Sequence, residues 1–77
     1  MTHDSIVRAC REAGLTTTQT PASDRRAYSA TNAALPGVGV YWTTSYQGFI
    51  LGLPRVAKDG VDTHARTCRE IKYLVTR

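Results

Sequence analysis

Few residues of this sequence have the types and spacing that catalysis or metal binding requires. The two histidines lie far apart in the chain: His3 is near the N-terminus, and His64 falls in the first turn of a predicted helix, where an exposed side chain is expected. Asp59 and Asp62 flank Gly60 without the further alternating ligands of a calcium loop. We therefore predict no enzymatic activity, no metal site and no cofactor.

The two cysteines do not form a recognisable motif. Cys10 and Cys68 belong to no Cys-x-x-Cys pair, so their spacing argues against a zinc site or a redox motif. Both lie on the apolar faces of predicted helices, where a buried thiol is unreactive. We expect two reduced thiols in the core. The alternative is a disulfide between them, which would require the two helices to pack as neighbours.

Arginine makes up eight of the ten basic residues, and the net charge of the chain is +4. Guanidinium groups make planar, bidentate contacts with phosphate and carboxylate groups. Two basic rows are expected on the outer sides of the predicted helices, formed by Arg8, Arg11, Arg66, Arg69, Lys72 and Arg77. Glu12 and Glu70 are interleaved with these rows and weaken their positive field. The rows predict either the basic rim of a protein interface or a phosphate-contacting surface for nucleic acid.

The segment from Ala27 to Pro54 has no charged residue and holds five of the six aromatic side chains. Its β-branched and aromatic residues favour strands. An uncharged aromatic surface with a basic rim is typical of a protein interface. On the outer side of the predicted sheet, the residues expected to contact a partner protein are Tyr41, Thr43, Tyr46 and Ile50. A neutral edge strand would also allow self-association.

Two helices and a sheet are needed to position these residues. The first helix is predicted from about Asp4 to Ala13, with Thr2 or Asp4 as the N-cap and Gly14 at its end. The segment from Thr16 to Asp24 is rich in threonine and serine. This composition predicts an exposed connector, with a short extended piece at its start as an alternative.

Three strands are predicted, over Arg25 to Thr31, Val38 to Thr44 and Phe49 to Leu53. Alternation along the second strand places its valines and Trp42 toward the core and Tyr41 on the opposite face. Pro54 is expected to close the third strand. The following residues, Arg55 to Gly60, are expected to form a loop.

The second helix is predicted from Val61 or Asp62 to the C-terminus, because apolar residues recur there with the period of a helix. The stretch Ile71 to Thr76 also alternates as a strand does, so a fourth strand is the alternative there. The helix is the favoured prediction. The predicted fold class is α+β in the order helix, three strands, helix, with a three-stranded antiparallel sheet and both helices packed on one face.

This order of elements resembles the topology of the double-stranded RNA-binding domain. Two sequence features of that domain are absent here. Pro36-Gly37-Val38-Gly39 has no histidine where the domain has Gly-Pro-x-His, and the second helix starts at Asp62-Thr63-His64 rather than at a Lys-Lys pair. The sequence is therefore assigned to no family, because a shared topology without the site residues assigns no function.

Length and composition limit the possible roles. A chain of 77 residues fits one small basic domain, residues 1–77, and its hydrophobic fraction of 42% predicts that it folds. No signal peptide or membrane span is recognisable, so a cytoplasmic protein is expected. The leading prediction is a non-catalytic binding protein that occupies the surface of a partner protein, as an accessory or inhibitor protein of a phage or other mobile element would. The alternative is a small nucleic-acid-binding domain that uses the helical arginines.

Overall fold

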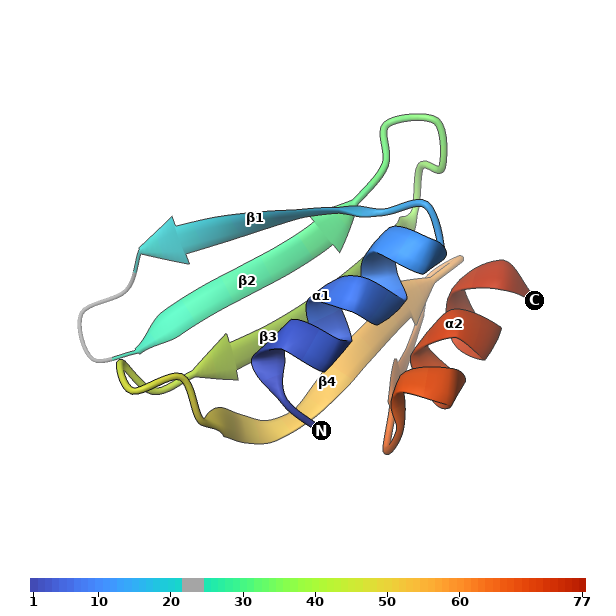
Figure 1. Ribbon diagram of the computed structural model, residues 1–77. Coiled ribbons are helices and arrows are strands. Elements are labelled where there is room, and N and C mark those ends of the chain that lie inside the picture. Colours follow the sequence, from blue (N-terminus) through green and yellow to red (C-terminus); the bar gives the residue numbers. More distant parts are fainter. Residues whose placement is uncertain (22–24) are drawn as a thin grey trace.

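The structure is a computed structural model that describes residues 1–21 and 25–77. Its elements, in order, are α1 (His3–Glu12), β1 (Thr16–Pro21), β2 (Arg26–Thr31), β3 (Val38–Thr44), β4 (Ile50–Lys58), β5 (Val61–His64) and α2 (Cys68–Thr76). The strands form one antiparallel sheet in the order β1-β2-β3-β4-β5, and both helices lie on the same face of it (Figure 1). The α+β class is confirmed, but the predicted number of three strands is wrong because the sheet has five.

Helix α1 begins at a reciprocal cap. The backbone N–H of Ser5 donates to Thr2 Oγ1 at 3.1 Å, and the backbone N–H of Thr2 donates to Ser5 Oγ at 2.9 Å. These bonds satisfy two donors that have no partner inside the helix. Gly14 follows the helix with φ at +87°, a conformation that costs glycine little. The prediction of Thr2 as the N-cap is confirmed.

Strand β1 occupies most of the segment that was predicted to be a connector. Its pairing with β2 runs from Thr16 opposite Thr31 to Pro21 opposite Arg26 without a register shift. Threonine has a high β-propensity, but an edge strand with exposed polar side chains shows no apolar alternation. The sequence signal for this strand was therefore weak. The end of the predicted connector, at Asp24, lies outside the described residues.

Strand β4 continues through Pro54, so the predicted end of this strand is wrong. The pairing register between β3 and β4 shifts next to Pro54, and Gly52 has φ at +76°. These two features mark a β-bulge, which tolerates a residue that has no N–H to donate to the ladder. The carbonyl of Pro54 accepts a hydrogen bond from the backbone N–H of Ala65 at 2.8 Å. The bulge therefore allows β4 to continue through Pro54.

The predicted loop from Arg55 to Gly60 and the predicted helix start at Val61 or Asp62 are also wrong. β4 ends at Lys58, which pairs with Val61 of β5, so only Asp59 and Gly60 connect the two strands. Both have positive φ, 52° and 82°, as a two-residue hairpin turn requires. The Asp-Gly pair was thus a hairpin signal, and β5 takes the place of the expected first turn of the helix.

Helix α2 begins later than predicted and includes Ile71 to Thr76, which confirms the favoured helical prediction for that stretch. The side chain of Thr67 caps it by accepting from the backbone N–H of Glu70 at 3.1 Å. The carboxylate of Glu70 in turn accepts from the backbone N–H of Arg66 at 2.7 Å. This arrangement explains the helix start, because it satisfies backbone donors on both sides of the cap.

The core lies between the two helices and the inner face of the sheet. Val40 and Trp42 of β3 point into it, as the alternation predicted. Helix α1 contributes Ile6 and Cys10 among others, and α2 contributes Ile71, Leu74 and Val75. Because this core needs only the inner face of the sheet, the opposite face remains available for other contacts.

Candidate partner-binding face of the sheet

The outer face of the sheet is the one turned away from the helices. Residues opposite one another on neighbouring strands point to the same side. Ser29, Tyr41, Arg55 and His64 form one such row across β2, β3, β4 and β5, and they alternate with core residues such as Val40. The outer face, as used below, consists of Thr18, Thr20, Ala27, Ser29, Gly39, Tyr41, Thr43, Leu51, Leu53, Arg55 and His64.

The ring of Tyr41 packs against the backbone of β3, in the space left by the missing side chain of Gly39. A β-carbon at Gly39 would lie 2.5 Å from the hydroxyl oxygen of Tyr41 and 2.8 Å from its Cζ. The ring therefore lies along β3 and covers Gly39, which is buried although it belongs to this face. The ring is half-buried and packs against the backbone of β3.

Arg55 links Tyr41 to the edge strand. Its guanidinium carbon lies 5.1 Å from the centroid of the Tyr41 ring, within the range of a cation–π contact. Its Nε lies 3.4 Å from Oδ2 of Asp62 on β5, and both side chains are about half exposed. An exposed ion pair of this kind adds little stability. It does orient the guanidinium group beside the aromatic ring.

A shallow depression of about 530 Å³ lies on the outer face. Leu51 and Leu53 line it with 46% and 47% of their surface exposed, and Tyr41, Arg55 and His64 contribute polar atoms. The depression is broad and open, whereas sites for small substrates enclose most of the ligand. An opening of this shape would leave much of a small ligand exposed to solvent.

The predicted contact residues Tyr41 and Thr43 do lie together on the outer face, but Ile50 does not. Ile50 pairs with Thr44, which is 1% exposed, and packs against the core. Leu51 instead lies opposite Thr43 and takes the expected position of Ile50. The prediction failed because the turn before β4 is one residue longer than expected, which reverses the side to which each residue of β4 points.

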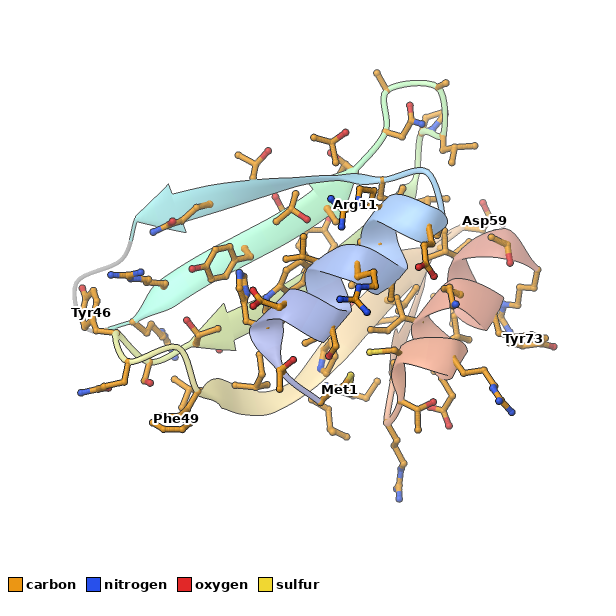
Figure 2. All side chains as sticks on the ribbon, in the orientation of Figure 1. Met1, Arg11, Tyr46, Phe49, Asp59 and Tyr73 are labelled. Atoms are coloured by element: carbon orange, nitrogen blue, oxygen red, sulfur yellow. The ribbon has the colours of Figure 1, made fainter. Side chains whose placement is uncertain are left out.

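Tyr46 and Phe49 belong to the turn between β3 and β4 and project at one end of the molecule (Figure 2). The turn is closed by hydrogen bonds from the backbone N–H of Ser45 to the carbonyl of Phe49 and from that of Gly48 to the carbonyl of Ser45, each 2.9 Å. The guanidinium carbon of Arg26 lies 5.6 Å from the centroid of Tyr46. Phe49 is 72% exposed, which the sequence did not indicate.

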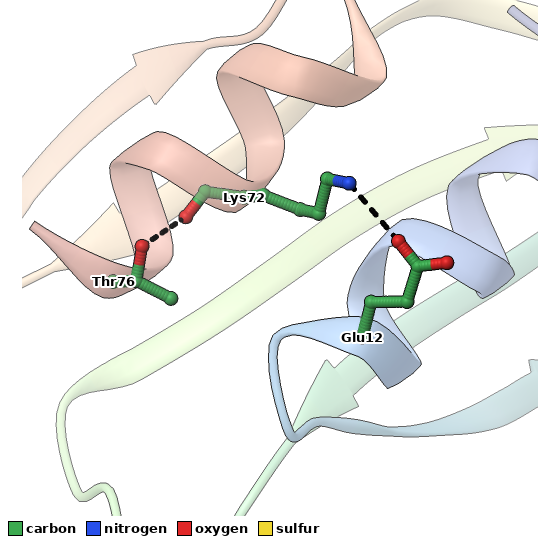
Figure 3. Close-up of polar contacts among 3 residues, drawn as sticks. All are labelled: Glu12, Lys72 and Thr76. Carbon is green, nitrogen blue, oxygen red and sulfur yellow. Dashed lines mark hydrogen bonds and ion pairs between the residues drawn. The ribbon is translucent and has the colours of Figure 1, made fainter.

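The predicted arginine rows come together only in part. A shallow groove between α1 and α2, of about 350 Å³, is lined by Arg8, Arg69 and Lys72, but also by Glu12. Lys72 Nζ lies 3.0 Å from Glu12 Oε1 (Figure 3), and its carbonyl accepts from Thr76 Oγ1. The hydrogen bond from Lys72, followed by its charge, lowers the pKa of Glu12. The other members of the rows, Arg11, Arg66 and Arg77, do not line this groove.

Both cysteines are free thiols. Cys10 is fully buried, and this burial, with a smaller contribution from Cys68, raises its pKa to about 12. Cys68 is half-buried and lines the groove between the helices. Burial of Cys10 agrees with the prediction, and the raised pKa makes this thiol a poor nucleophile.

His3 has a structural role that the sequence did not reveal. The indole N–H of Trp42 donates to Nδ1 of His3 at 3.0 Å, and the centroid of the His3 ring lies 4.3 Å from that of Tyr28. Tyr28 and Trp42 stack with centroids 5.7 Å apart. The partners of His3 come from β2 and β3, so only the tertiary structure could show this contact.

No protein family, curated protein or solved structure matches this chain. Among residues 1–21 and 25–77, no three histidine, cysteine, aspartate or glutamate side chains are grouped so that they could hold a metal ion. None of the helices in this part of the chain is long and apolar enough to cross a membrane.

Proposed function

We propose that this protein is a non-catalytic binding protein that occupies the surface of a partner protein through the outer face of its sheet. The observation that supports this most directly is that both helices cover the opposite face of the sheet (Figure 1). The outer face is left with Leu51 and Leu53 exposed and Tyr41 half-buried around an open depression. Blocking a partner's surface requires no reactive group, which fits an accessory or inhibitor role.

The composition of the outer face supports a protein partner. Tyrosine and arginine are the residues most often found at the energetic centre of protein interfaces, and Tyr41 and Arg55 lie in contact here. The leucines supply apolar area, and threonine and serine side chains supply hydrogen-bonding groups around it. A tyrosine that is already fixed over Gly39 loses little conformational entropy on binding.

The size of the protein also constrains the interface. An interface of ordinary size takes about 800 Å² from each partner. The molecule measures 32 × 22 × 20 Å, so such an interface needs most of one of its faces. The outer face of a five-stranded sheet provides this area without displacing the helices. We therefore expect the partner to cover most of the outer face.

The alternative proposal is nucleic-acid binding through the helical arginines. Its support is the groove in which Arg8, Arg69 and Lys72 lie close together. The ion pair between Lys72 and Glu12 reduces the positive charge available there to a phosphate group. For this reason the outer face supports the better proposal.

The proposal can be tested with a matched pair of tyrosine variants. A partner captured from the native host with the wild-type protein is purified, and its affinity for wild type, Tyr41→Ala and Tyr73→Ala is measured by calorimetry. Tyr73 is 64% exposed on α2 and serves as the control. We expect Tyr41→Ala to raise Kd about 30-fold, as the loss of a central anchor does, and Tyr73→Ala to leave it unchanged.

A salt titration separates the two proposals. Duplex DNA and duplex RNA should bind weakly and without dependence on Arg69. If binding is instead strong, falls linearly in log affinity against log salt, and is weakened by Arg69→Gln but not by Tyr41→Ala, the arginine groove is the functional surface and our proposal is wrong.

A further inference from the structure

The first half of β4 has a free edge. β4 runs from Ile50 to Lys58, but β5 pairs only with its last four residues, Arg55 to Lys58. On the other side, Ile50 and Leu51 pair with β3. In Figure 1 the start of β4 forms the border of the sheet, with no strand on the side away from β3. This part of the strand therefore has one side on which another strand could add.

Two backbone N–H groups point outward along this edge. The carbonyl of Phe49 accepts from Ser45 and that of Leu51 accepts from Thr43 Oγ1, so both carbonyls point toward β3. In a trans peptide unit the N–H points opposite to the carbonyl, and the structure has no cis peptide bond in its described part. The N–H groups of Ile50 and Gly52 consequently point away from β3. Such outward N–H groups can donate to an added strand.

Apolar side chains accompany this edge. Phe49, Leu51 and Leu53 are 72%, 46% and 47% exposed. β1 also has a free edge, since it lies at the other end of the sheet, but its residues 16–20 are threonine and glutamine. Compared with the edge of β1, the edge of β4 combines outward backbone donors with apolar anchors, so it is the better site of the two for a strand that must bind from solution.

The charges around this edge are mostly positive. Arg26 is opposite Thr44, which is itself opposite Ile50. Arg55 follows the free part of β4, and His64 is opposite Arg55. Arg66 follows Ala65, whose backbone N–H donates to the carbonyl of Pro54. The carboxylate of Asp62 pairs with Arg55, and that of Glu70 accepts from the backbone N–H of Arg66. A second copy of this chain would bring the same cations to the edge. A strand with acidic flanks complements the charge better.

We infer that the free edge of β4 receives an extended segment of the partner protein, which adds to the sheet as a further strand beside Ile50 to Gly52. The segment has apolar residues at alternating positions, which contact Leu51 and Leu53, and acidic residues at its flanks, which face the surrounding arginines. Main-chain hydrogen bonds supply affinity in this mode of recognition, and the alternate side chains supply specificity. The inference rests on the proposed function and specifies the chemistry of its partner.

A random peptide library displayed on phage is the probe for this inference. We expect selection on the wild-type protein to enrich peptides with alternating apolar residues and flanking acids. Synthetic copies of these peptides should slow hydrogen exchange at the amides of Ile50 and Gly52, as measured by NMR. Failure to enrich any such peptide, or protection of β1 amides instead, would contradict the inference.

Two matched substitutions and a modified peptide complete the test. Leu51→Lys should weaken peptide binding at least 10-fold, whereas Tyr73→Lys, which places the same charge at an exposed apolar residue of α2, should not. Circular dichroism checks that both variants fold. N-methylation of alternate peptide amides leaves the protein unchanged and should abolish binding if main-chain hydrogen bonds are made. Equal affinity of the methylated peptide would overturn the inference.

The outcomes also distinguish this inference from the proposed function. If the partner's affinity depends on Tyr41 but an N-methylated partner segment binds normally, the outer face is the binding surface and the added strand is wrong. If the wild-type protein forms a dimer in sedimentation experiments that Leu51→Lys dissociates, the occupant is a second copy of the chain, and the inference of an acidic partner strand is wrong.

Discussion

The aromatic ring of Tyr41 covers Gly39, its neighbour two positions earlier on β3, where a β-carbon would come within 2.5 Å of the phenol oxygen. This contact connects the backbone of the sheet to the surface proposed for partner binding. Glycine is normally unfavourable inside a strand because it has no side chain to pack. Here the ring of Tyr41 packs against the backbone of Gly39, and this contact restricts the position of the ring.

Replacing this glycine should affect both stability and binding. Gly39→Ala should force the Tyr41 ring away from β3 and lower the free energy of unfolding by about 1 kcal/mol, at the low end of the cost of overpacking. Urea denaturation measures this change. In the Tyr41→Ala background the same substitution should cost less, because the clash is absent. Additive effects of the two substitutions would show that the contact does not constrain the ring.

The hydrogen bond between Trp42 and His3 should stabilise the fold. His3→Ala leaves the indole N–H without its acceptor in a partly buried place. We expect the free energy of unfolding to fall by about 1 to 2 kcal/mol and the fluorescence of the single tryptophan to change. His64→Ala is the control, since His64 is exposed on the outer face. An equal effect of both substitutions would contradict a specific role for His3.

The ion pair between Glu12 and Lys72 should be visible in the titration of the carboxyl group. Lys72→Gln should raise the pKa of Glu12 toward its ordinary value, because Lys72 is the main cause of its lowering. Lys72→Arg should keep it lowered. NMR titration of the Glu12 side-chain carbon measures both. Since the folded-state pKa is lowered, the stabilisation is present above the ordinary pKa of glutamate and disappears as pH falls through the lowered value.

The two thiols should react at very different rates in the folded protein. With a pKa of about 12, Cys10 is almost entirely protonated at pH 8, and it is also fully buried. We expect iodoacetamide to modify Cys68 at least 100-fold faster, as determined by mass spectrometry of timed samples. Denaturant should make both thiols accessible. Equal rates without denaturant would show that α1 opens readily.

The raised pKa of Cys10 also predicts a dependence of stability on alkaline pH. In the unfolded chain this thiol ionises near its ordinary value of 9.0, whereas in the fold it stays protonated until about pH 12. Above pH 9 the unfolded state therefore binds fewer protons, and the free energy of unfolding should decrease as pH rises. Cys10→Ala should show a smaller decrease in urea denaturation between pH 8 and pH 10. An unchanged slope would contradict the assignment to Cys10.

Local sequence signals predicted several local features correctly, although the two-residue hairpin turn at Asp59 and Gly60 was missed. The bounds of β3 were predicted as Val38 to Thr44 and are those of the structure, because its apolar alternation is strong. Thr2 was one of the two predicted N-caps, with Asp4 as the other, and its partner Ser5 is only three residues away. Helix formation by Ile71 to Thr76 was likewise favoured by the spacing of its apolar residues. The roles proposed for Tyr41, Thr43 and the helical arginines stay predictions.

Residue type and short-range spacing were enough to predict the α+β class, the inner face of β3 and a neutral aromatic centre bounded by basic helices. Three features depend on the tertiary structure. β1 joins the sheet, β4 continues through Pro54 at a bulge, and Leu51 rather than Ile50 faces outward. Each of these depends on hydrogen bonds and register between strands, which residues distant in the chain form together. The free edge beside Ile50 is a consequence of the same pairing, since it exists only because β5 is shorter than β4.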